Sequence, residues 1–134
     1  MYWLGSDGVI GPMPRIIINC VTVADDCAPS FFRNTNEQVG ITYTVGAADE
    51  FKLIVIDNAS PVSVIIPSNS NVKIPVGARM DIIQKGTGKV TISGGSGVTI
   101  SSKGGNKAIG GQYVAVSIIQ NAVDYWFLIG DLIA

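Results

Sequence analysis

Alternating apolar and polar positions dominate the chain from residue 41 onward and predict short β-strands. The tetrapeptide VTIS occurs twice, at 90–93 and at 98–101. Within each copy, Val and Ile lie on one side of an extended chain while Thr and Ser lie on the other. Gly94, Gly95 and Gly97 separate the copies and are expected to supply the positive-φ conformations of a turn. Each copy is therefore predicted to be a half-buried strand, with the glycines forming a corner.

Similar short segments recur along most of the sequence, and none shows a helical period of useful length. Further strands are predicted at 15–23, 41–45, 52–57, 62–67, 79–84, 112–119 and 124–130. One helical turn is expected at 46–51. Many short strands separated by Gly, Pro and Asn corners predict an all-β fold, which we interpret as an antiparallel β-sandwich or jelly-roll-like domain.

The first forty residues follow a different pattern. Residues 1–15 contain three glycines and two prolines without periodicity, which predicts an extended N-terminal arm. A polar stretch at 24–40, interrupted by Phe31 and Phe32, reads as a loop whose length favours a function or contact with a partner. The predicted organisation is an arm, first strand and long loop at 1–40, followed by a β-sandwich domain at 41–134.

The last long strand is apolar on both of its faces. Tyr125, Phe127 and Ile129 share one face, and Trp126 and Leu128 share the other. We expect one face to lie in the core and the other against an identical neighbour across a symmetric interface. For the indole ring, alternation favours the core or a subunit interface over a sugar-binding platform, and we select both Tyr125 and Trp126 as candidate contact residues.

The arm carries a second group of candidate contact residues. Tyr2, Trp3 and Leu4 are large apolar side chains in a segment with too many chain breakers for a core element. We interpret them as anchors that insert into a neighbouring subunit. Trp3, Tyr125 and Trp126 are also the candidates for an aromatic platform if the protein binds sugars.

Low charge supports a protein that is partly covered by other subunits. Apolar residues make up 47% of the chain and charged residues only 14%, against a usual quarter. The sequence shows neither a secretory signal nor a stretch of membrane-spanning length, so we expect a soluble protein that is synthesised in a cytosol and does not bind membranes.

The few charges are unevenly distributed. Residues 73–107 have a balance of +5, and residues 1–72 have a balance of −4. Lys85, Lys89 and Lys103 are therefore candidates for contact with an acidic surface, with a merely solvated surface as the alternative. Nucleic-acid binding is not expected, because the overall balance is acidic and no aromatic residues alternate with the basic ones.

Candidate catalytic and metal-binding chemistry is sparse. The chain contains no histidine, which excludes Ser-His-Asp and Cys-His arrangements. Cys20 and Cys27 cannot complete a four-ligand zinc site alone; we interpret them as reduced, buried residues, with a disulfide as the alternative. Adjacent acids at 25–26 and 49–50 are expected to diverge. We therefore expect no enzyme activity, no cofactor and no metal.

Several short motifs between residues 41 and 134 occur together in a recognisable order. They are Ile66-Pro67, Ile74-Pro75-Val76-Gly77, Ile83-Gln84 with Gly86 and Gly88, Gly97 to Ile100, Gly111-Gln112-Tyr113, and Trp126 with Leu128, Gly130, Asp131 and Leu132. This series resembles a β-rich module that recurs in structural proteins of tailed bacteriophages, both in tail fibres and in small head proteins.

The resemblance implies a virion structural protein that is made in the cytoplasm of a bacterial host. Because a forty-residue lead and no shaft precedes the matched region, we favour a decoration or cement protein on the capsid surface. Its expected partners are the major capsid protein and copies of itself, with three subunits implied by the family alone. The alternative is a tail-fibre or receptor-binding module that recognises carbohydrate.

Overall fold

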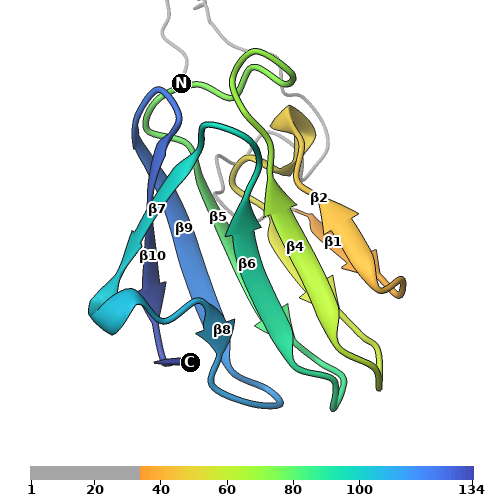
Figure 1. The fold of residues 1–134 in the computed structure, drawn as a ribbon. Helices are drawn as coiled ribbons and strands as arrows, with labels where there is room; N and C mark the ends of the chain where they lie inside the picture. The colour runs from red at the N-terminus through yellow and green to blue at the C-terminus, as the bar shows by residue number, and fades with distance from the viewer. Residues whose placement is uncertain (1–33) are drawn as a thin grey trace, which may run out of the picture. The chain divides into compact units, whose positions relative to one another are not determined.

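The computed structural model describes residues 34–134, which form two mixed β-sheets (Figure 1). The strands are β1 (Thr35–Gln38), β2 (Thr42–Thr44), β3 (Leu53–Ile56), β4 (Val62–Ile66), β5 (Arg79–Gln84), β6 (Val90–Gly94), β7 (Thr99–Ser102), β8 (Ala108–Ile109), β9 (Ala115–Ala122), β10 (Tyr125–Gly130) and β11 (Leu132–Ile133). Two 3-10 helices, η1 (Ala47–Asp49) and η2 (Lys103–Gly105), are the only helices in these residues. The all-β prediction is confirmed.

The chain alternates between the two sheets from β1 to β6. The six-stranded sheet has the order β1-β3-β5-β9-β10-β7, and the five-stranded sheet has the order β11-β8-β6-β4-β2. Each strand from β1 to β4 therefore pairs in parallel with the strand two places later. Antiparallel pairs involve β8 and β9. The antiparallel arrangement that we predicted is wrong, because the short connections from β1 to β6 lead to the opposite sheet, and the hairpin of β9 and β10 is an exception.

Inward-facing side chains of both sheets form one apolar core. The six-stranded sheet contributes Ile54, Ile56, Met80, Ile82, Val116, Ile118, Trp126 and Leu128, and the five-stranded sheet contributes Val62, Val64, Ile66, Val90, Ile92 and Ile109. These side chains are at most 2% exposed. Burying one Ile or Leu side chain stabilises a fold by about 1.5–3 kcal/mol, so this core is the main source of stability.

Successive corners at one end of the sheets pack directly on one another. Gly88 N donates to Asn58 O at 2.8 Å. A Cβ atom on Gly88 would lie 2.0 Å from Ser60 O, and one on Gly86 would lie 2.4 Å from Asn58 N. Since these neighbours are backbone atoms, only glycine permits the close approach. The Gly-rich motif at 83–91 is therefore a corner between the two sheets.

The glycines between the VTIS copies have different roles from those predicted. Only Gly97, with φ +84°, has positive φ among the three. Gly94 instead belongs to β6, where a Cβ would lie 2.8 Å from Val98 O. Gly95 N donates to Ile66 O at 2.7 Å. One positive-φ residue and two close contacts are therefore enough to make this corner.

Strand positions were predicted well where the residues alternate and poorly where they do not. β1 lies inside the predicted polar loop at 24–40, because its sequence TNEQ has no apolar face. It nevertheless pairs with β3, so the segment before residue 41 joins the same sheet. The two-residue strands β8 and β11 were not predicted, and β9 begins at Ala115, three residues later than expected. The predicted arm, the strand at 15–23 and both cysteines lie outside the described residues.

A hydrogen-bonded cluster joins β1, β2 and η1 at one edge of the two sheets. Asp49 is 3% exposed and accepts hydrogen bonds from Asn36 Nδ2 at 2.8 Å, from Gly46 N at 2.9 Å and from the Tyr43 hydroxyl. Burial, and next the hydrogen bond to Asp49, raise the pKa of Tyr43 to about 12. These donors satisfy the carboxylate without a basic side chain among residues 34–134.

Candidate interaction surface

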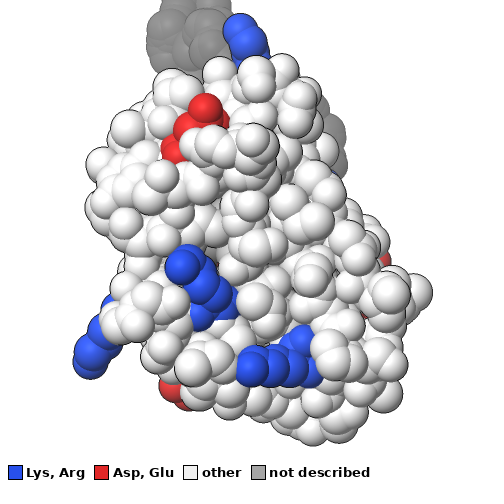
Figure 2. Space-filling view, viewed as in Figure 1, with Lys and Arg blue, Asp and Glu red and all other residues white. Residues whose placement is uncertain are grey.

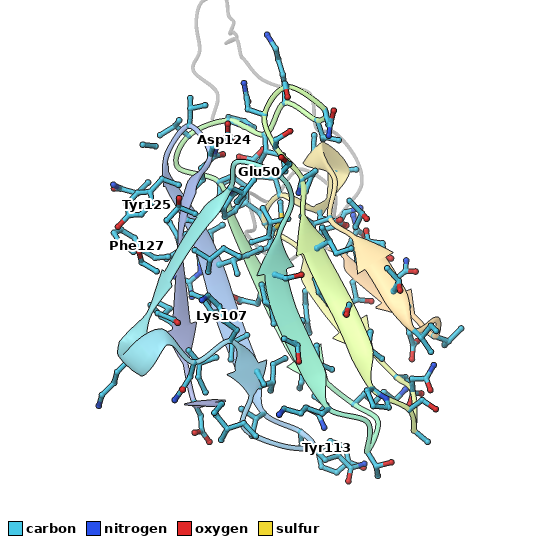
Figure 3. The ribbon with its side chains drawn as sticks, viewed as in Figure 1. Glu50, Lys107, Tyr113, Asp124, Tyr125 and Phe127 are labelled. Carbon is cyan, nitrogen blue, oxygen red and sulfur yellow. The ribbon has the colours of Figure 1, made fainter. Side chains whose placement is uncertain are left out.

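β10 separates its side chains into a buried and an exposed apolar set. Trp126 and Leu128 are each 1% exposed and lie in the core. Phe127 is 37% exposed and Ile129 49% exposed, and Tyr125 is half-buried beside them. Figure 3 shows Tyr125 and Phe127 on the outer side of this strand. The prediction of two apolar faces is confirmed, but the selection of Trp126 as a contact residue is wrong, because its ring lies in the core and does not reach the surface.

The exposed residues of β10 continue into neighbouring strands of the six-stranded sheet. The pairing register places Phe127 opposite Ile119 of β9. On the other side of β9, Ile83 of β5 lies opposite Val55 of β3. We call this surface the outer apolar face; its members are Leu53, Val55, Ile83, Ile119, Tyr125, Phe127 and Ile129.

Three polar side chains that bond to one another interrupt the outer apolar face. Arg79 Nε lies 3.4 Å from Asp81 Oδ1, and Arg79 Nη2 donates to Ser117 Oγ at 3.2 Å. Ser117 Oγ in turn donates to Asp81 Oδ1. Arg79 and Asp81 are the only charged residues of β3, β5, β9 and β10. The face therefore has no net charge from these four strands, and this exposed pair adds little stability.

The two aromatic rings of the face hold each other in a fixed arrangement. The ring centroids of Tyr125 and Phe127 are 5.4 Å apart, and their planes meet at 67°, which is the favourable edge-to-face geometry. Ser101 Oγ of β7 donates to the Tyr125 hydroxyl at 3.0 Å. These contacts restrict both rings before any partner binds, which lowers the entropy cost of binding.

Two of the three lysines proposed for an acidic surface have partners within the chain. Lys85 Nζ lies 3.0 Å from Glu37 Oε2 and 4.0 Å from Asp57 Oδ2. The hydrogen bond to Glu37 is the main cause of the raised pKa of Lys85. Lys89 Nζ donates to Ala134 O at 2.7 Å. Figure 2 shows the basic residues of one face in separate groups.

Lys103, the third of these lysines, is exposed and belongs to η2. The basic and acidic parts of the sequence therefore neutralise each other in part within the chain, through Lys85. Contact between the lysines and an acidic surface stays a prediction.

Tyr113 is an exposed aromatic residue that our sequence analysis did not select. Its side chain is 71% exposed, and its backbone has φ +67°. Tyr113 N donates to Gln84 O at 2.6 Å, which holds the turn before β9. A bulky residue at positive φ is strained. The adjacent Gly110-Gly111 pair signals a turn, but nothing in the sequence indicates that the ring is held outward (Figure 3).

The remaining predicted contact residues, Tyr2, Trp3, Leu4, Phe31 and Phe32, lie outside the described residues. Between residues 34 and 134, no group of three or more His, Cys, Asp or Glu side chains is arranged to hold a metal ion. The same residues contain no helix long and apolar enough to span a membrane. The chain matches no known protein family, no curated protein and no solved structure.

Proposed function

We propose that this chain is a non-enzymatic structural protein of a bacteriophage particle, a decoration or cement protein on the capsid surface. In this proposal it bridges neighbouring subunits of the major capsid protein and associates with copies of itself. We infer further that the two sheets constitute a β-sandwich with a jelly-roll-like course. The motifs between residues 41 and 134 that resemble phage structural modules support this assignment.

The observation that carries the proposal is the outer apolar face. Phe127 at 37% and Ile129 at 49% exposure lie beside half-buried apolar residues on a rigid sheet. Exposed apolar side chains gathered on one face of a sheet are typical of protein–protein contacts, even where a polar group lies among them. A face without net charge suits contact with an identical copy, since like charges would otherwise oppose each other. A cement protein acts mechanically, by adding buried area between subunits.

Self-association can be tested with one substitution on this face. Phe127→Ser removes an exposed ring without opening the core, so we expect a folded protein with weaker self-association. Val123→Ser is the matched control, because Val123 is 58% exposed and lies outside the face, beside the β9–β10 turn. Light scattering at micromolar concentration measures the mass. A wild-type monomer, or equal masses for both variants and wild type, would contradict self-association through this face.

The location in the particle requires a separate experiment. Antibodies against this chain, used in electron microscopy of purified particles, should label the head. Labelling at the tail would replace the cement proposal with the tail-fibre alternative. Particles that contain the chain nowhere would remove both.

One observation favours the alternative, a carbohydrate-binding module of a tail protein. The edge-to-face pair Tyr125 and Phe127 shares its sheet face with the polar groups of Arg79, Asp81 and Ser117. Sugars pack their apolar ring faces on aromatic side chains and hydrogen-bond to such polar groups. Binding of host surface glycans by wild type, lost in Phe127→Ser, would support this function.

A further inference from the structure

A groove lies where the two sheets separate between β6 and β7. Its volume is about 270 Å³. Ile92, which is fully buried in the core, and the partly buried Val98 and Ile100 supply its apolar lining. Val98 and Ile100 of the second VTIS copy are therefore partly accessible to solvent through this groove.

Polar groups surround the apolar lining on the rim. Thr91 and Ser93 of β6 supply hydroxyl groups, and Lys107, just before β8, supplies an ammonium. Lys107 O accepts a hydrogen bond from Ile92 N at 2.8 Å, which fixes the lysine backbone beside the groove. Figure 3 shows Lys107 in the opening between β6 and β7, and Figure 2 shows basic side chains at this place.

The ammonium of Lys107 differs from those of Lys85 and Lys89 in its hydrogen-bond and ion-pair partners. Lys85 pairs with two acids, and Lys89 donates to Ala134 O. Among residues 34–134, no hydrogen-bond acceptor or acidic side chain pairs with Lys107 Nζ. Lys107 as a residue is partly buried beside the groove, and an unpaired ammonium next to an apolar surface gives an incoming carboxylate a charge-assisted hydrogen bond.

We propose that this groove receives an aliphatic side chain next to a carboxylate, presented by a neighbouring protein subunit. The volume lies below the about 300–1,000 Å³ of small-molecule sites, so it suits one or two side chains. An apolar side chain would fill the lining formed by Val98 and Ile100, and the carboxylate would pair with Lys107.

The groove is distinct from the outer apolar face, to which Val98, Ile100 and Lys107 do not belong. The proposal therefore does not depend on the phage assignment. Its failure would leave that assignment standing, and the reverse also holds.

Nuclear magnetic resonance titration of the full chain with two capped dipeptides tests the proposal. The probes are a leucine–aspartate and a leucine–asparagine dipeptide, which differ in charge but hardly in shape. We expect the aspartate probe to shift the amide signals of 91–94, 98–100 and 107, and to bind at least about fivefold more tightly than the asparagine probe. No shift in these segments, or equal binding of both probes, would overturn the proposal without any need for a variant.

Two lysine variants assign the charge effect. Lys107→Gln should reduce the preference for the aspartate probe to near one. Lys103→Gln is the matched control, because Lys103 lies in the adjacent η2 but does not line the groove; it should keep the full preference. Retention of the preference in Lys107→Gln, or its loss in both variants, would show that Lys107 does not select the carboxylate.

Discussion

The two copies of VTIS have the same four residues and different surroundings. In β6, Val90 and Ile92 are both 0% exposed. In the second copy, Val98 and Ile100 are only partly buried and line a groove. β6 lies inside the five-stranded sheet between β4 and β8, whereas β7 is an edge strand of the six-stranded sheet and, among the strands that the structure describes, pairs with β10 alone. Alternation thus selects the apolar side of a strand, while the position in the sheet decides how completely that side is covered.

The largest expected difference between the copies comes from truncating their isoleucines. Ile92→Ala should destabilise the fold by about 2–5 kcal/mol, because it leaves a cavity in a closed core. Ile100→Ala should cost about 1 kcal/mol, since the groove already exposes part of this side chain to water. Urea unfolding of both variants measures the two free energies. Equal losses would show that the groove is closed in solution.

A smaller effect is expected at the corner that joins the copies. Gly97→Ala places a side chain at φ +84°, which costs about 1–2 kcal/mol in the left-handed region. Gly95→Ala is the control, because Gly95 does not have positive φ and its Cβ would lie 3.3 Å from the nearest atom, Ile66 O. Thermal unfolding should show the greater loss for Gly97→Ala. The reverse order would mean that contact with Ile66, and not backbone strain, limits this corner.

The same comparison explains which elements could be predicted from the sequence. β4, β5 and β6 have buried residues at every second position, so their alternation identified them almost to the residue. β1 is a polar edge strand, and only its pairing with β3 makes it regular. Strand partners were not predictable either, because alternation is the same for parallel and antiparallel neighbours.

The candidate surfaces were predictable to different degrees. The two apolar faces of β10 follow from alternation within one strand. Alternation left open whether Trp126 lies in the core or at a subunit interface, and its selection as a contact residue was wrong because the residue is only 1% exposed. The groove beside Lys107 requires β6, β7 and the segment before β8 to meet in space, although β6 and β8 belong to one sheet and β7 to the other. Pairing of Lys85 with Glu37 likewise joins residues far apart in the chain. Contacts between distant segments were therefore the part that sequence patterns could not supply.

The smallest effect concerns pH. It tests whether the stability that the two VTIS copies contribute is independent of the hydrogen-bonded cluster at the edge formed by β1 and β2. Tyr43 lies in β2, which β4 separates from β6, and its pKa is raised to about 12. An unfolded tyrosine ionises near pH 10. Between these values the unfolded chain has released a proton that the folded chain retains, so stability falls as pH rises. The contribution is complete below pH 10 and is lost as pH approaches 12.

Urea unfolding at several pH values from 9 to 12 measures this loss, and Tyr43→Phe is the control that removes the titrating hydroxyl. The variant should show a shallower decline, with the remainder due to groups such as Lys85, whose raised pKa acts in the same direction. Because the edge cluster and the two copies share no hydrogen bond, the difference between Ile92→Ala and Ile100→Ala should stay constant across this range. A difference that changes with pH would show that ionisation of Tyr43 in β2 alters the packing of the core beneath β6. The burial of the first copy would then depend on the cluster around Asp49 as well as on its place between β4 and β8.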